Sequence, residues 1–504
     1  MLILNQKPSL EVSLLTYNPI KMKKKFIIYT MALGLFMSSC EKMVEVEPKN
    51  QISTEAALST VGGYESLLNS AYVRLIGFGY RGRDFNLLGD VMADNIYTEL
   101  SVANGRYIAQ NSNNVGSHFN IWTAAYQTIN DVNTIIDNID ALNDPAGQSR
   151  KAALKAEALS LRALVYFDLA RVYGYEPTNI ATSGSGFNLS VPLRLKSTAG
   201  LPDAEQVPRA TVAQVYAAIE ADLKASIAIF PSGATASRTR MNKGAAYALL
   251  AKTYLYAGRW AEAVTAADDA MNTANTGARL TGAGTYVNAF KASPNTESFF
   301  ELVINPTTQL GGVTGSNDSM YSYTHPSGYN GFSTFGGQTV SDELFALFAA
   351  GDDRRAMIFQ FGGTAASASP VFNWSDKYSG ARGAYADNPK VIRFADVLLI
   401  KAEALAEQNQ FVAAAAIVTQ LRANRNAGAL VVPTDLNIKN FIQDERRREL
   451  FFEGERWFDL KRKGSAIIKP AKTGIGSIPA TDFRLLAPIP NAEFLLGLER
   501  NPGY

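Results

Sequence analysis

Tyrosine and phenylalanine side chains gather in two stretches of the sequence that are rich in glycine and small polar residues. The stretches span residues 77–117 and 319–337, and the second reads SMYSYTHPSGYNGFSTFGG. Flat rings beside hydrogen-bonding groups suit sugars, whose C–H faces stack while their hydroxyls bond, and they suit peptides equally well. The candidate ligand-binding residues are Tyr80, Arg81, Tyr97, Asn104, Arg106, Tyr107, Tyr321, Tyr323, Tyr329 and Phe332. For each single ring, the alternative is that it packs its loop onto the body of the protein.

The sequence offers few residues for metal binding or nucleophilic catalysis. His118 and His325 are its only histidines and Cys40 is its only cysteine, so a zinc site with the usual ligands is nearly excluded and no cofactor is expected. Neither a Gly-x-Ser-x-Gly elbow nor a phosphate-binding Gly-Lys-Ser/Thr loop occurs. Paired carboxylates of the glycosidase type remain open, because 46 acidic residues always allow a pair at some spacing.

The densest cluster of charges is DERRRELFFEGERWFDLKRKG at residues 444–464. On a helix, Leu450, Phe451, Trp457 and Phe458 fall on one side, with Gly454 where a neighbour can approach closely. Three pairs of opposite charge have the three-residue spacing of helical ion pairs: Glu445 with Arg448, Arg446 with Glu449, and Glu453 with Arg456. A ligand site is one interpretation, but the pairing favours a helix whose arginines tie loops to the frame.

An export signal precedes the body of the chain. Met22 opens a basic start that is followed by an apolar run at residues 26–37. This run is shorter than the roughly 20 residues of a bilayer span, and small residues follow it, as in a secretory signal peptide. We interpret residues 1–21 as an upstream extension from a misplaced start codon and residues 22–39 as the signal peptide.

Cys40 follows Met37, Ser38 and Ser39, and this pattern resembles the bacterial lipobox, in which lipid is attached to the thiol and the chain is cut just before it. Multiple acyl chains, at about 0.8 kcal/mol per buried methylene, hold a protein on a membrane. We therefore predict lipidation of Cys40, with residues 40–52 as a polar tether. The alternatives are an ordinary signal peptide with a stray cysteine and an uncleaved membrane anchor.

The body, from residue 53 onward, is predicted to be all-α. Amphipathic patterns at 118–139 and 149–174 flank a short turn and predict an antiparallel helical hairpin. Alanines at close-packing positions, with bulky residues a turn away, are typical of tetratricopeptide-like helix pairs that stack into a scaffold. Such pairs are predicted within residues 118–174, 211–271 and 391–425.

Long inserts interrupt this helical pattern. They lie at residues 77–117, 174–210, 275–390 and 464–490, and the third contains one short predicted helix at 341–348. Loops of such length in a compact protein are usually functional, so the binding site is expected on these segments. The formal net charge of +2 gives no indication of a nucleic-acid partner.

Four segments of the body resemble the SusD/RagB family of Bacteroidetes outer-membrane nutrient-binding lipoproteins. They are ALSLRALVYFDLARVYG, VIRFADVLLIKAEALAE with LRANRN, ERRRELFFEGERWFDLKRKG and LLAPIPNAEFLLGLERNPGY, and the last two together are highly specific. The likeness spans residues 53–504, with the RagB/SusD-type C-terminal region at about 290–504.

The resemblance implies an all-helical, non-enzymatic protein built on four tetratricopeptide-like helix pairs in a right-handed scaffold. It further implies a surface-exposed outer-membrane lipoprotein that presents oligosaccharides, or in some members peptides, to a SusC-like TonB-dependent transporter. Asp94 and Asn95 look like the family's frame before its first variable loop, which makes 96–117 the corresponding loop. That loop contains Tyr97 and Tyr107 but no tryptophan, which is a departure from starch-like binding.

Two other hypotheses remain open at the level of sequence. One is an anchored glycosidase that uses paired carboxylates, and the other is a periplasmic scaffold that uses its helix pairs only for protein contacts. Turnover of an oligosaccharide would distinguish the glycosidase from a binding protein. Protease shaving of intact cells would distinguish the periplasmic scaffold from a surface-exposed binding protein.

Overall fold

The computed structural model describes residues 58–504, apart from 102, 104, 145–146, 201–204, 232–236, 274–275, 309–317, 363–369 and 384. The predicted extension, signal peptide, lipidated Cys40 and tether lie outside the described residues, and so does Asn104. Residues 58–504 form one structural unit.

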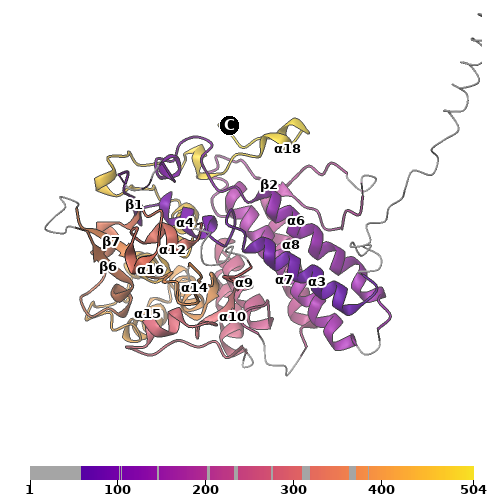
Figure 1. Ribbon diagram of the computed structural model, residues 1–504. Coiled ribbons are helices and arrows are strands. Elements are labelled where there is room, and N and C mark those ends of the chain that lie inside the picture. Colours follow the sequence, from indigo (N-terminus) through magenta and orange to yellow (C-terminus); the bar gives the residue numbers. More distant parts are fainter. Residues whose placement is uncertain are drawn as a thin grey trace, which may run out of the picture. The chain divides into compact units, whose positions relative to one another are not determined.

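Eight helices form the frame, and each packs against the next in chain order (Figure 1). This succession confirms the predicted helical scaffold. The hairpin predicted before residue 174 consists of the second helix of the first pair below and the first helix of the second pair, which pack against each other. The first pair is interrupted, because a long insert separates its two helices. The helices are α3 (Val61–Leu75) with α6 (Trp122–Asn138), α7 (Gln148–Tyr173) with α8 (Val212–Ile229), α9 (Lys243–Tyr256) with α10 (Trp260–Asn272), and α14 (Phe394–Glu407) with α15 (Phe411–Ala423).

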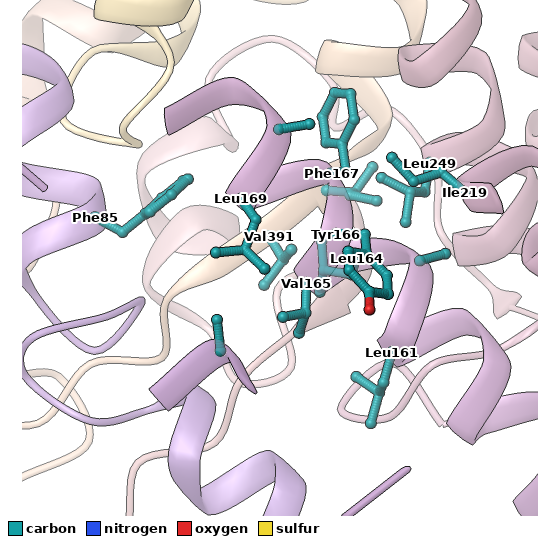
Figure 2. Packing of buried hydrophobic residues seen from close by; sticks show 14 of the residues in the cluster. Phe85, Leu161, Leu164, Val165, Tyr166, Phe167, Leu169, Ile219, Leu249 and Val391 are labelled. Carbon is teal, nitrogen blue, oxygen red and sulfur yellow. The ribbon is translucent and has the colours of Figure 1, made fainter. Parts of the chain in front are cut away.

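Local sequence sets where these helices begin. Thr211 and Gln214 form a capping box at the start of α8, and the Asn242 side chain accepts a hydrogen bond from Ala245 N at the start of α9. Helix α7 is buried along most of its length because helices pack on several of its sides. Figure 2 shows Leu164 and Phe167 of this helix close to Ile219 and Leu249 of its neighbours.

The inserts carry short strands, which form three small antiparallel sheets. The four-stranded sheet has the order β1-β5-β7-β6, so it joins the first insert to the third. Its strands are β1 (Ile96–Thr98), β5 (Gln338–Val340), β7 (Phe372–Ser375) and β6 (Ile358–Phe361). The two-stranded sheets pair β2 (Leu189–Pro192) with β3 (Arg209–Thr211) and β4 (Ser298–Glu301) with β8 (Lys390–Arg393).

Shorter helices complete the inserts and the C-terminal region. The one predicted at 341–348 is present as α13, where the Ser341 side chain caps Leu344 N. The α-helices are α4 (Asp84–Val91), α5 (Ile108–Asn111), α11 (Tyr286–Lys291), α12 (Met320–Thr324), α13 (Asp342–Phe345), α16 (Ile438–Leu450), α17 (Arg456–Arg462) and α18 (Asn491–Leu495). The 3-10 helices are η1 (Ile139–Ala141), η5 (Tyr329–Gly331), η6 (Asp353–Met357), η7 (Ala471–Thr473) and η8 (Phe483–Leu485).

The segment 444–464 forms two helices, α16 and α17, so the prediction of one continuous helix was wrong. The chain turns between them at Phe452 and Gly454, which have positive φ values of 61° and 81°. The close approach predicted at Gly454 is confirmed, because a Cβ on Gly89 of α4 would lie 2.5 Å from Gly454 O. This crossing places the aromatic residues of the segment in the core.

Most ion pairs of this segment join residues that are farther apart in the sequence than the three-residue spacing of helical pairs. Of the three predicted pairs, only Glu445 with Arg448 forms, at 2.8 Å. Arg446 instead contacts Asp459 at 2.9 Å. Arg456 binds Asp94 of the first insert at 2.7 Å, so an arginine of this segment does hold an insert in place, as the structural interpretation expected.

Glu449 is the centre of a buried network of charges. Its two carboxylate oxygens accept hydrogen bonds from Arg393, Arg425 and Arg354 at 3.0–3.1 Å. Glu453, the third acid of the predicted pairs, accepts from Lys377 and Arg393 at 2.7 Å. Because these partners come from the third insert and from the helix frame, the network joins the two.

Candidate functional site

The two aromatic stretches predicted from the sequence lie side by side. The Tyr107 ring meets the Tyr323 ring edge to face, with centroids 5.0 Å apart. Arg83 of the first insert binds Asp318 of the third at 2.7 Å. Strand β1 also pairs with β5, with Tyr97 opposite Thr339. Candidate residues more than 200 positions apart in the sequence therefore share one surface region.

Hydrogen bonds and charges fix the orientation of Tyr107 and Tyr323. The Tyr107 hydroxyl donates to Asp84 Oδ1 at 2.6 Å, and the Tyr323 hydroxyl donates to Asp318 Oδ1 at 3.1 Å. Burial, together with the nearby Asp318, raises the pKa of Tyr323 to about 12. Both phenols therefore stay protonated, and they act as fixed hydrogen-bonding groups at neutral pH.

Arg106 and Tyr97 lie at the border of this region. The Arg106 guanidinium stacks over the Phe335 ring, 3.7 Å from its centroid. Tyr97 stacks on Phe372 of β7, with centroids 6.3 Å apart, and Lys472 lies 6.0 Å from its ring. Each of these side chains is partly exposed and available for contact.

Tyr321 lies beneath the surface. It is 1% exposed, its ring stacks on His325 with centroids 4.0 Å apart, and the half-buried Phe332 meets it edge to face. His325 Nε2 lies 3.2 Å from Asp376 Oδ1, and Lys291 donates to the other oxygen. Burial alone would raise the pKa of Asp376, but the hydrogen bonds from His325 and Lys291 hold this pKa below its usual value.

Three neighbouring rings, two of them half-buried and one exposed, form a group that we call the Tyr329 platform, which consists of Tyr329, Phe359 and Phe361. Tyr329 stacks on Phe359 with centroids 4.5 Å apart, and Phe361 meets Tyr329 edge to face at 5.8 Å. Phe361 is 44% exposed. Flat, partly exposed rings of this kind can stack against a ligand.

Phe359 and Phe361 were not among the candidate residues predicted from the sequence. They lie on β6, where residues two apart face the same side of a strand. The pattern Phe-Gln-Phe within the third insert was the available signal. It is short, however, and alternation over three residues does not separate a strand from a loop.

Tyr80 and Arg81 lie in the interior. They are 1% and 4% exposed, and both bind the buried Asp168 of α7. The Tyr80 hydroxyl donates to Asp168 Oδ2 at 2.8 Å, and Arg81 donates to both carboxylate oxygens at 2.6 and 2.8 Å. Their side chains anchor the start of the first insert to the frame, and we therefore leave them out of the proposed ligand site.

Three of the acidic residues near the rings, Asp84, Asp318 and Asp376, are bound to cations. Asp84 and Asp318 both pair with Arg83 at 2.7 Å, and Asp376 pairs with Lys291. His118, the second histidine, is buried against Trp457, and burial lowers its pKa to about 3. Among the described residues, no group of three or more His, Cys, Asp or Glu side chains is placed to hold a metal ion. The region is built for stacking and hydrogen bonding.

None of the helices in the described part of the chain is long and apolar enough to cross a membrane.

Comparison with known proteins gives consistent matches. Residues 44–255 match a SusD-like family described as starch-binding and associating with the outer membrane, and residues 363–504 match the SusD family. The chain is 26% identical to SusD-like protein P2 of Formosa agariphila, over 95% of this chain and all of that protein.

Solved structures share the fold. A SusD superfamily protein from Bacteroides thetaiotaomicron matches with 25% identity and a TM-score of 0.75, over 88% of this chain and all of that one. A laminarin-binding SusD-like protein matches with 22% identity and a TM-score of 0.70, over 88% of this chain and 99% of that one. The two family models together match residues 44–255 and 363–504, the relative and the solved structures cover most of the chain, and the chain belongs to the SusD/RagB family.

Proposed function

We propose that this chain is a non-catalytic outer-membrane lipoprotein that binds oligosaccharide or peptide nutrients at the cell surface and delivers them to a SusC-like TonB-dependent transporter. The observation that carries the binding step is the Tyr329 platform. It presents stacked rings at the surface, and a sugar ring can lay its C–H face on such rings. Oligosaccharides are the favoured ligands, because the matched family is described as starch-binding.

The other candidate residues take two roles in this proposal. Tyr97, Arg106 and Phe332 are half-exposed and can contact ligand beside the platform. Tyr321 is buried under the platform, where its hydroxyl donates to Tyr329 O at 3.5 Å, and Tyr323 is buried against Tyr107 and Phe335. Tyr107 links the two inserts through its ring contact with Tyr323. Asn104 belongs to the same loop and stays a prediction from the sequence.

The absence of catalysis is proposed from the ion pairs of three carboxylates near the rings. A glycosidase needs one carboxylic acid that keeps its proton and one free carboxylate. Asp84, Asp318 and Asp376 near the rings are held by Arg83 or Lys291. We expect oligosaccharides incubated with the pure protein to be recovered intact by chromatography. Products that disappear on substitution of one of these carboxylates would favour the anchored glycosidase instead.

The binding step is tested by titration calorimetry of the purified protein against neutral glucan hexasaccharides and a peptide panel. Phe361→Ala removes an exposed ring, and we expect it to weaken glycan binding about tenfold, equivalent to about 1.4 kcal/mol. Val431→Ala is a matched control, since Val431 is 87% exposed on a distant loop after α15. If Phe361→Ala binds as tightly as the wild type does, the platform is not the site.

Delivery requires a physical complex with a transporter. Affinity capture of the tagged, membrane-extracted protein from its native host is expected to recover a TonB-dependent outer-membrane protein. Protease treatment of intact cells is expected to degrade the chain, because the proposal places it on the outer surface. A chain protected from protease, with no transporter recovered, would favour the periplasmic scaffold.

A further inference from the structure

A cavity whose lining residues lie far from the platform in the sequence is found beside α6. It is lined by α6, by residues 192–198 and 205–207 and by residues 493–498, and its volume is about 680 Å³. Volumes of 300–1,000 Å³ are typical of small-molecule sites. We call it the α6 cavity. It shares no lining residue with the Tyr329 platform.

The α6 cavity has an apolar base. Trp122, Tyr126 and Ile129 line it from α6, and Leu496 and Leu498 line it from the C-terminal segment. The Trp122 and Tyr126 rings contact each other, with centroids 4.9 Å apart, and Trp122 is only 4% exposed. Leu496, at the edge, is 66% exposed. Exposed apolar side chains bordering a cavity are typical of an interaction site.

Hydrogen bonds hold the wall opposite α6 in place. The Tyr126 hydroxyl donates to Pro192 O at 2.8 Å. Asn130 makes two bonds with the backbone of Thr198, and Asn133 donates to the carbonyls of Arg194 and Lys196. These bonds fix the position of residues 192–198 without any ligand. The cavity is therefore preformed, which lowers the entropic cost of binding.

The charges that line the cavity balance one another, with three basic and three acidic side chains. Arg74 binds Asp131 at 2.9 Å, and Lys196 binds Asp137, just outside the lining, at 3.1 Å. The lining charges are Arg74, Arg194, Lys196, Asp131, Glu205 and Glu493. The lining charges are balanced and two of the basic ones are already in ion pairs, so the cavity does not favour an ionic ligand, which would have to compete with these pairs.

Polar groups for an uncharged ligand remain around the apolar base. Thr123 and Gln206 are exposed at the lining. Gln127 accepts a hydrogen bond from Arg74 through Oε1, which leaves the donors of its amide nitrogen to face a ligand. Rings, aliphatic side chains, hydroxyls and amides together match the alternating apolar and polar faces of a sugar.

We propose that the α6 cavity is a second ligand site, which takes a short neutral oligosaccharide. The choice of an oligosaccharide rests on the proposed function, whereas the cavity, its rigidity and its charge balance are independent of it. The protein would then bind a nutrient chain at two separate places, at the platform and at the α6 cavity.

The test blocks the cavity from an exposed position. Thr123→Trp adds a large ring at the lining, and Asn138→Trp adds the same ring at an exposed position on the same helix that does not line the cavity. Calorimetry with maltohexaose and laminarihexaose is expected to give two sites in the wild type and in Asn138→Trp. Thr123→Trp is expected to lose one site, with at least a tenfold fall in its affinity, while its thermal midpoint stays that of the control.

The outcomes separate the two proposals. If Thr123→Trp leaves the number of sites and their affinities unchanged, the α6 cavity site is wrong, and the platform proposal stands. If Phe361→Ala has no effect while Thr123→Trp abolishes binding, the cavity stands and the platform is wrong. If a hexamer of an acidic sugar binds the cavity more tightly than both neutral hexamers do, the assignment to neutral ligands is wrong. If no hexamer binds the wild type, both proposals fall.

Discussion

Gly89 of α4 and Gly454 of the turn between α16 and α17 cross so closely that neither position has room for a side chain. A Cβ on Gly454 would lie 2.6 Å from Phe85 O, and one on Gly89 would lie 2.5 Å from Gly454 O. The contact joins the start of the first insert to the C-terminal segment.

Gly454→Ala is therefore expected to destabilise the protein strongly. The φ of 81° alone costs a non-glycine residue about 1–2 kcal/mol, and the backbone clash adds to this cost. Gly474→Ala is the matched control, because Gly474 has a φ of 63° but no atom within 4 Å of its added Cβ. Chemical denaturation should show a much larger loss for Gly454→Ala. Equal losses would mean that the crossing contributes nothing beyond backbone strain.

The variant Tyr80→Phe tests whether Tyr80 stabilises the fold or contributes to ligand binding. It removes the hydrogen bond to the buried Asp168, and we expect a loss of about 1–2 kcal/mol in the free energy of unfolding. Glycan affinity measured by calorimetry should not change, because Tyr80 is 1% exposed. A tenfold weaker affinity in a stable Tyr80→Phe protein would return this residue to the ligand site.

The buried ion network predicts a loss of stability in acid. Burial would raise the pKa of Glu403 and Glu445, but the charges of Arg462 and Arg354, respectively, outweigh it and lower each pKa to about 2. The unfolded pKa is 4.5, so the native state binds fewer protons than the unfolded state between these values. The contribution to stability is complete above about pH 4.5 and is lost as the pH falls toward 2.

Glu445→Gln is expected to reduce this pH dependence and to lower stability at pH 7 by about 3–5 kcal/mol, because Arg354, Arg422 and Arg448 lose a charged partner. Urea denaturation between pH 3 and pH 7 measures both effects. Glu499→Gln, at an exposed position near the C-terminus, serves as the control. An unchanged slope against pH in Glu445→Gln would contradict the role given to this carboxylate.

Lipidation of Cys40 is tested by Cys40→Ala. Metabolic labelling with a fatty acid should mark the wild-type chain and leave the variant unlabelled, and cell fractionation should move the variant out of the membrane fraction. The reason is that multiple acyl chains supply the membrane affinity. A variant that stays membrane-bound and labelled would show that another residue carries the lipid.

The helix frame was predictable because its signal is local and repeated. Patterns such as the alanine-rich stretch of α14 extend over several turns, and they predict a helix even where, as in α14, the helix is buried on most sides. For the two tyrosine-rich inserts, the sequence predicted only that both contribute to ligand binding. It did not predict that they contact each other. Their contact at Tyr107 and Tyr323 depends on strand pairing between residues that are more than 200 positions apart.

The ion pairs and the interior roles were not predictable from spacing. Glu449 binds three arginines from different parts of the chain, and Arg81 binds Asp168, which lies 87 positions away. The tertiary fold determines which charged residues meet, and sequence spacing alone does not predict these long-range partners. Tyr80 and Tyr329 look alike in the sequence, but one is buried in the frame and the other stacks at the surface.

The pairing of β1 with β5 limits how binding preference can diversify during evolution. Both strands are three residues long, and an added or deleted residue in either one would shift the register and turn the side chains that follow it in that strand to the opposite face of the sheet. Length changes there would disturb both inserts at once. New preferences can therefore arise most readily through single amino-acid replacements at Tyr329, Phe359 and Phe361, which leave the paired backbone intact.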